Sequence, residues 1–428
     1  MRGRTLAVSA VAISFIGVGC GWHGTSVEAA DAPGRPSSEG GTDAPVPGSG
    51  AGVPIPDGNV RDGGAGVIDC DGSIGPLPPP QTYRRVYSTL NFGHCGLPVA
   101  DSEGNVALEV SESNHPAWDL LTRDGSRIGT ADAWQGALFP AAPGYIIEQG
   151  NSGGPNNAPD IEAIEPNGAR RNHTRVFGRP LLVPTSRGGL LAVGPISAGF
   201  VAPSDALQMA WQLREDATSL WGPTALALQS GVLGAGSDED GRVLVIQDGA
   251  SEFGEGAIAA QWFERDGSAL TGAFILIPQL RLRSSTWFET SAIAGGIAIR
   301  RMDQDTPTAP RRGEWVAVLH SGSQRPDPAP EWLRSRPDTD LARLADGRYA
   351  MLPWGRDASP CTQSIEILSS GGATCETLPL PVDSGRCRTR DLRRGLDGTL
   401  LQMVPADRED AQALTRSCTL RFWPRALP

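Results

Sequence analysis

Apolar and polar residues alternate in short stretches along this chain, and most of these stretches run into a turn signal. Residues 260–265 alternate between outward polar and inward apolar positions, which is typical of a half-buried strand. Asp266-Gly267 follows as a hairpin signal, because glycine tolerates the positive φ that tight turns require. Residues 269–274 then return as a second strand. The pattern predicts a strand–turn–strand unit.

Diverged copies of this unit recur along the chain. Their turns fall near residues 125, 168, 216, 267, 322, 371 and 424. Most copies follow a more continuous apolar strand that often begins at a glycine, at positions 104, 144, 188, 241, 295, 347 and 398. A repeat of roughly 43 to 55 residues with several strands in each unit is typical of a β-propeller.

The chain is therefore predicted to be all-β, a β-propeller of seven four-stranded blades. One blade cannot bury both of its faces alone, whereas a ring of blades buries them and leaves few strand edges. The apolar runs at 189–193, 243–246 and 297–299 are expected to be inner strands buried on both faces. Four tryptophans precede the turns and are expected to pack between neighbouring blades: Trp118, Trp211, Trp262 and Trp423.

The seventh copy ends too early to complete its blade. Residues 83–90 form an unassigned strand near the other end of the chain. The resemblance to propellers implies that this strand supplies the missing outer strand of the last blade and closes the ring. Six or eight blades are alternatives, because the third and fifth copies are degenerate. A β-sandwich array is the alternative fold.

The first nineteen residues have the pattern of an export signal. Arg2 and Arg4 precede an apolar run over residues 6–16, which is too short to span a bilayer. The run leads to Gly19-Cys20, which resembles the lipobox of bacterial lipoproteins. The resemblance implies that Cys20 is lipidated and, since Gly21 rather than Asp follows it, that a Gram-negative host sends the protein to the outer membrane. An ordinary secretory signal with an incidental cysteine is the alternative.

Cysteine usage agrees with an exported protein. With Cys20 assigned to the lipid, six of the seven cysteines remain for disulfides: Cys70, Cys95, Cys361, Cys375, Cys387 and Cys418. Six cysteines allow fifteen connectivities. Pairing between neighbours is expected, as Cys70–Cys95, Cys361–Cys375 and Cys387–Cys418. Zinc is the alternative, but no close C-x-x-C spacing supports a metal site.

The composition divides the chain into three parts. Residues 1–19 form the signal peptide, residues 20–80 the lipidated cysteine and a disordered tether rich in Gly, Pro and Ser, and residues 81–428 the propeller. The tether has too few large apolar residues to repay the entropy of ordering, and its expected reach is about 40 Å.

Charge and motifs exclude several functions. The net charge of −11 argues against nucleic acid as a partner and offers no polybasic membrane patch, so membrane contact is expected only through the lipid. No phosphate loop or dinucleotide fingerprint is present. Residues 151–155 resemble the Gly-rich setting of some serine nucleophiles and are expected to form a loop between strands. The five histidines lack metal-ligand spacing, and the acidic turns at 238–241 and 303–305 do not complete a calcium loop. No catalytic residue, metal or cofactor is assigned.

The sequence favours a monomeric binding or scaffolding module at the cell envelope, with an unidentified protein or polysaccharide ligand. This resembles bacterial lipoproteins with propeller heads of unassigned role. The alternative is a propeller hydrolase or lyase that acts on extracellular polysaccharide. Carboxylates converging at one mouth of the ring, or a carboxylate pair beside an aromatic platform, would favour the enzyme, and a featureless polar mouth would favour binding.

Overall fold

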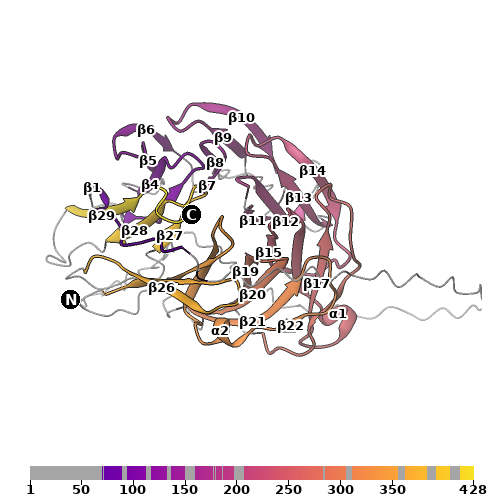
Figure 1. Cartoon of the computed structure of the whole chain (residues 1–428). Coiled ribbons are helices and arrows are strands. Elements are labelled where there is room, and N and C mark those ends of the chain that lie inside the picture. Colours follow the sequence, from indigo (N-terminus) through magenta and orange to yellow (C-terminus); the bar gives the residue numbers. More distant parts are fainter. Residues whose placement is uncertain are drawn as a thin grey trace, which may run out of the picture.

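Seven antiparallel sheets form a ring around a central channel (Figure 1), which confirms the predicted seven-bladed β-propeller. This computed structural model describes residues 70, 72–88, 94–111, 117–132, 136–149, 160–176, 178, 180–185, 187–196, 207–282, 285–304, 311–354, 362–382, 392–404 and 415–428. Blades are numbered in chain order, and strands within a blade are counted outward from the channel. No helix within these residues is long and apolar enough to cross a membrane.

The innermost strands of blades 1 to 7 are β3 (Val99–Ala100), β7 (Leu138–Pro140), β11 (Leu181–Pro184), β15 (Val232–Ser237), β19 (Thr286–Ile293), β23 (Thr339–Arg343) and β27 (Leu392–Arg394). The second strands are β4 (Val106–Ser111), β8 (Tyr145–Gln149), β12 (Leu190–Ile196), β16 (Val243–Asp248), β20 (Gly296–Asp303), β24 (Tyr349–Pro353) and β28 (Leu400–Val404). The short strand β2 (His94–Cys95) also pairs with β4.

The third strands are β5 (Ala117–Leu121), β9 (Asp160–Ile164), β13 (Leu207–Leu213), β17 (Ile258–Phe263), β21 (Arg312–His320), β25 (Ser364–Leu368) and β29 (Thr415–Trp423). The outer strands are β6 (Arg127–Asp132), β10 (Arg170–Arg175), β14 (Ser219–Ala225), β18 (Phe274–Ile277), β22 (Asp327–Pro328), β26 (Thr374–Pro379) and, in blade 7, β1 (Gln81–Ser88). Two one-turn helices, α1 (Ala250–Phe253) and α2 (Glu331–Arg334), lie in connections between strands.

The predicted glycine turns join the first strand to the second, and the predicted hairpin turns follow the third strand. Because the strands are antiparallel, both sets lie on one face of the ring, which we call the turn face. Gly267 illustrates the requirement for glycine: its φ is 81°, and a Cβ there would lie 2.5 Å from the indole of Trp221 in the preceding blade. In the copy that lacks the glycine, Ala217 takes a positive φ of 60° instead.

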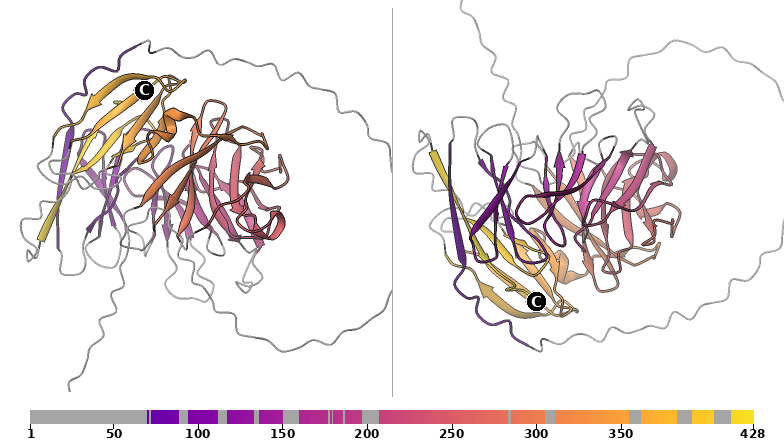
Figure 2. Two further views of the ribbon diagram at one scale, coloured as in Figure 1. Left: turned by 90° about the horizontal axis from the view of Figure 1, so that it is seen from below. Right: turned by 90° about the horizontal axis from the view of Figure 1, so that it is seen from above.

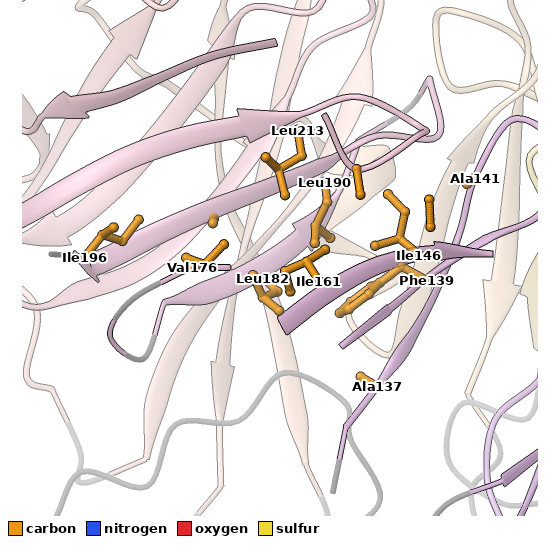
Figure 3. Close-up of a cluster of buried hydrophobic side chains, with 13 residues drawn as sticks. Ala137, Phe139, Ala141, Ile146, Ile161, Val176, Leu182, Leu190, Ile196 and Leu213 are labelled. Atoms are coloured by element: carbon orange, nitrogen blue, oxygen red, sulfur yellow. The ribbon is translucent and has the colours of Figure 1, made fainter. Parts of the chain in front are cut away.

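The core consists of separate clusters between neighbouring blades. Between blades 2 and 3, Ile146 and Ile161 pack against Leu182 and Leu190 (Figure 3). The predicted apolar runs at 189–193, 243–246 and 297–299 are buried, but they lie in the second strands rather than at the channel. The four tryptophans pack into such clusters as predicted, with Trp211 half-buried and the other three buried.

Strand β1 closes the ring as predicted. It pairs with β29 along its full length, from Gln81 opposite Phe422 to Ser88 opposite Thr415. The seam with blade 1 is an apolar cluster that includes Leu108 and Phe422, with a polar group around the buried Asp119 beside it. The Tyr83 hydroxyl donates to Asp119 Oδ2 at 2.9 Å, and Arg127 Nε lies 2.9 Å from Asp119 Oδ1. Burial, with help from the Asp119 carboxylate, raises the pKa of Tyr83 to about 12.

The disulfides differ from the predicted neighbour pairs. Cys70 is bonded to Cys375 on β26, and Cys95 to Cys418 on β29. Ring closure explains the difference, because it brings the N-terminal segment beside the last two blades, more than 300 residues along the chain. Cys20, Cys361 and Cys387 lie outside the described residues, so the predictions that involve only them stay predictions.

Residues 72–80 form a strap on the outside of blades 6 and 7, where the sequence places the end of the tether. The Glu376 carboxylate accepts from the backbone N–H of Ile74 at 2.8 Å, and Trp423 Nε1 donates to the carbonyl of Pro78 at 2.8 Å. The strap lies beside the C-terminal residues in Figure 2. The folded part therefore extends N-terminal of residue 81, whereas the predicted signal peptide and residues 20–69 lie outside the described residues.

Candidate functional site

A cavity of about 590 Å³ occupies the central channel, and the innermost strands of all seven blades contribute to its wall. Its rim includes residues just before or at the start of inner strands, such as Pro98, Ala137 and Ser285. Because inner strands run toward the turn face, these rim residues lie toward the opposite face, which we call the mouth face. The sequence could not assign a binding face, and the cavity lining extends to the mouth face.

The two sides of the cavity differ in chemistry. The side made by blades 2, 3 and 4 is apolar and includes Leu138, Phe139, Leu181, Val183 and Val232. The side made by blades 5, 6 and 7 carries the charged groups Glu289, Arg300, Asp340, Arg393 and Arg394, and blade 1 adds the carboxylate of Glu109. An apolar wall with a few convergent polar groups is the usual composition of a small-molecule site, and the volume lies in the usual range.

Arg300 on β20 organises the charged side. Its guanidinium lies between two indoles, with Cζ 4.9 Å from the ring centre of Trp315 and 4.7 Å from that of Trp354. Nη2 lies 2.7 Å from Glu289 Oε2 and 2.6 Å from Asp340 Oδ1. The Arg300 side chain is only 4% exposed, whereas Glu289 and Asp340 are 23% and 24% exposed. Arg300 thus holds two carboxylates at the cavity wall while remaining behind them.

Indole groups also orient the two carboxylates. Trp287 Nε1 donates to Glu289 Oε1 at 3.2 Å, and Trp354 Nε1 donates to Asp340 Oδ1 at 3.0 Å. Trp287 itself lines the cavity and is half-buried. The mouth is therefore not featureless: it holds a carboxylate pair beside an aromatic ring. Both carboxylates already share the Arg300 guanidinium, an arrangement that suits recognition of a fixed shape and charge.

The sequence analysis missed these residues because it missed the innermost strands. Some of those strands, such as β3 with two residues, are too short for an alternating pattern to emerge. The strands that carry Glu289 and Asp340 are eight and five residues long, and their side chains do not alternate regularly between buried and exposed positions. One signal was available: each inner strand ends just before one of the predicted glycine turns, so counting back from Gly104 or Gly144 reaches Ala100 or Pro140. Arg300 gave another signal, as a charge directly after a buried apolar run.

The other candidates from the sequence do not converge. His173 and His320 are exposed, and the remaining histidine side chains lie outside the described part of the chain. Asp238 accepts from the backbone N–H of Arg242 at 2.8 Å and from the Ser321 hydroxyl at 2.5 Å, which is a turn-capping role. Among the described residues, no group of three or more His, Cys, Asp or Glu side chains could hold a metal ion.

Glu148 on β8 is a second unusual carboxylate, and it is not part of the cavity lining. Its cross-strand neighbours on the same face are Ala137 and Ile161, both buried in the cluster between blades 2 and 3 (Figure 3). Within the described residues no side chain pairs with it. Desolvation raises the pKa of Glu148 from 4.5 to about 7.

Replacing Glu148 with glutamine is expected to remove a pH dependence of stability. Because the pKa of Glu148 is raised in the folded state, folding favours the protonated carboxyl. The wild type therefore has its full stability at acidic pH and loses part of it as the pH rises through about 7. At pH 8 the variant is expected to be about 3 kcal/mol more stable than the wild type, since one pKa unit corresponds to about 1.4 kcal/mol. Urea unfolding at pH 4 and pH 8 tests this. A difference between the two proteins that is the same at both pH values would contradict it.

Comparison with known proteins adds little to this site. No protein-family model and no curated protein matches the chain. Streptogramin B lyase is similar in structure, with 10% identity and a TM-score of 0.36 over 79% of this chain and 98% of the lyase. Prolyl oligopeptidase B from Galerina marginata gives 9% identity and a TM-score of 0.44 over 74% of this chain and 48% of that one. A protein of unknown function from Bacteroides caccae gives 12% identity and a TM-score of 0.31 over 71% and 94%. None of these similarities bears on the chemistry of the cavity.

Proposed function

We propose that the propeller is a binding module and that the central cavity is its ligand site. The observation that carries this proposal is the pairing of an apolar wall on blades 2 to 4 with a charged wall on blades 5 to 7 around about 590 Å³. The charged wall is preformed, because Arg300 is stacked between two indoles and fixes both carboxylates. A preformed site loses little conformational entropy when a ligand binds.

We propose further that the module is exported and anchored through a lipid on Cys20, at the outer membrane of a Gram-negative cell. The lipobox-like sequence supports the anchor. The two disulfides support an oxidising compartment, since such bonds persist outside the cytoplasm. Labelling with a palmitate analogue and membrane fractionation test the anchor. The full chain should be labelled and sediment with membranes, whereas Cys20→Ala should do neither.

Cleavage of an extracellular polysaccharide, by a hydrolase or a lyase reaction, is the second candidate function. The carboxylate pair of Glu289 and Asp340 beside Trp287 favours it, because glycosidases use two acidic groups. The shared ion pairing with Arg300 counts against it, since both carboxylates are already engaged. Release of reducing ends from cell-envelope polysaccharide that stops in Glu289→Gln would favour the enzyme over the binding module.

A cavity-filling substitution tests the binding proposal. The full chain would be immobilised and incubated with solubilised envelope material, in parallel with Val183→Trp and Val382→Trp. Val183 lines the cavity, whereas Val382 is 65% exposed and lies outside the cavity lining, so it controls for a new tryptophan. Capture that Val183→Trp abolishes and Val382→Trp retains supports the cavity as the site. Equal capture by all three proteins would contradict it.

A further inference from the structure

The charged groups that line the cavity balance one another. They are three carboxylates and three guanidinium groups, those of Glu109, Glu289, Asp340, Arg300, Arg393 and Arg394. Arg300 pairs with Glu289 and Asp340. Arg394 donates to the Pro428 carbonyl at 3.3 Å and is attracted by Asp397, and Glu109 and Arg393 have partners as well. The described part of the lining therefore has no net formal charge, and a charged ligand would find no unpaired counter-charge in it.

One face of β19 presents an aromatic ring, a carboxylate and a hydroxyl group in a row along the cavity wall. These belong to Trp287, Glu289 and Ser291, because alternate residues of a strand point to the same side. β19 pairs with β20 in a continuous register, so the alternation is unbroken. Phe288 lies on the other face and is buried in the cluster between blades 4 and 5. Since inner strands run toward the turn face, Trp287 is the member of the row nearest the mouth face.

Trp287 is held in place and is still accessible. Its Nε1 donates to Glu289 Oε1 at 3.2 Å, and Arg311, which is not part of the lining, lies with Cζ 5.6 Å from the centre of the ring. The indole is half-buried, so part of it is exposed. Glu289 and Asp340 likewise keep about a quarter of their side-chain surface exposed, although both pair with Arg300. A ligand can therefore contact an apolar ring and two oriented carboxylates within one small region.

We propose that the cavity binds a neutral saccharide. A sugar ring packs its C–H groups against Trp287 and the apolar wall, and its hydroxyl groups donate to Glu289 and Asp340. An ionised carboxylate has about four lone-pair sites, so it can accept from a hydroxyl group in addition to forming an ion pair. A saccharide fills these roles without adding charge to a balanced lining, whereas an amine or a carboxylic acid adds one. The inference rests on the proposed binding function, whose ligand class it names.

Calorimetric titration of the full chain with trisaccharides at pH 6 tests the proposal. Cellotriose and triacetylchitotriose are neutral probes, the chitosan trimer is a cationic probe, and trigalacturonate is an anionic probe. At least one neutral trisaccharide is expected to bind more tightly than both charged ones, by about tenfold, because the charged probes bring an unbalanced charge into the cavity. A charged trisaccharide that binds as tightly as the better neutral one, or no binding by any of the probes, would overturn the proposal.

Two substitutions at the cavity wall change its charge balance in opposite directions. Glu109→Gln leaves an excess positive charge, and Arg393→Gln leaves an excess negative charge. Relative to the neutral trisaccharide, trigalacturonate is expected to gain affinity several-fold in Glu109→Gln, and the chitosan trimer in Arg393→Gln. If neither affinity ratio shifts, charge balance does not select the ligand and the proposal fails.

A pair of tryptophan substitutions tests where the saccharide binds. Trp287→Ala is expected to weaken binding of the neutral trisaccharide at least about tenfold. Trp211→Ala is the matched control, because Trp211 is also half-buried and its Nε1 donates to Ser219 Oγ at 3.0 Å, but it is not part of the cavity lining. Equal binding by the two variants would place the saccharide elsewhere and overturn the proposal.

Failure of this inference can be distinguished from failure of the proposed function. If Val183→Trp abolishes capture of envelope material but no trisaccharide binds to the wild type, the saccharide inference fails and the binding function stands. If Val183→Trp changes neither the capture of envelope material nor trisaccharide binding, both fail.

Discussion

Replacing Arg300 with methionine is expected to lower the free energy of unfolding by about 3–5 kcal/mol. Methionine keeps apolar bulk between Trp315 and Trp354 but removes the charge that Glu289 and Asp340 share. Two carboxylates, each about a quarter exposed, would then lose the guanidinium that they share. Chemical unfolding of the two proteins at neutral pH measures the loss.

A compensated variant separates lost charge pairing from lost packing. In Arg300→Met/Glu289→Gln/Asp340→Asn the wall is neutral, and most of the stability is expected to return, because replacing a whole buried ion network costs far less than removing one member. Arg300→Lys keeps the charge but loses the planar stacking between the indoles, so it is expected to fall between the wild type and the methionine variant. A methionine variant within about 0.5 kcal/mol of the wild type would contradict the assigned role of Arg300.

Removing the Cys95–Cys418 disulfide is expected to have an effect of similar size. The bond joins residues 323 positions apart, so it greatly restricts the unfolded chain, and the loop-closure account gives about 6 kcal/mol for such a loop. The double variant Cys95→Ala/Cys418→Ala avoids a free thiol in the buried position of Cys418. Thermal and urea unfolding of the variant measure the effect.

The second disulfide provides a matched comparison. Cys70→Ala/Cys375→Ala opens a loop of nearly the same length, 305 residues, but its bond fixes the strap rather than a strand of the ring. If chain entropy dominates, the two variants lose similar stability. A loss below about 1 kcal/mol for the Cys95–Cys418 variant would contradict this account of ring closure.

Much of the architecture could be predicted from local sequence, because the turn residues determine where each strand ends and the next one begins. Asp266-Gly267 and its counterparts specify hairpins through a backbone conformation that few residues other than glycine adopt readily, and this requirement survives divergence of the strands. The closing strand was predictable for a related reason: an unpaired strand at the N-terminus and an incomplete blade at the C-terminus complement each other.

The site was not predictable in the same way. Glu289, Arg300 and Asp340 come from three strands of two blades and meet only after the blades stack. The disulfides depend equally on ring closure, since Cys70 reaches Cys375 only when blade 7 has been completed by β1. Spacing along the chain carries no signal for contacts of this kind, so the neighbour pairing of cysteines was wrong for a physical reason.

The placing of Cys70 and Cys95 on either side of β1 has a mechanical consequence. The closing strand would be the first to peel away if the chain were pulled from its N-terminal end, because only one neighbour holds it. With Cys70 bonded to β26 of blade 6, such a force passes into that blade before it reaches β1. We expect single-molecule pulling from the N-terminus to unzip β1 at low force after reduction and to leave it paired before reduction. The same bond would let the folded ring withstand a force applied through its N-terminal end.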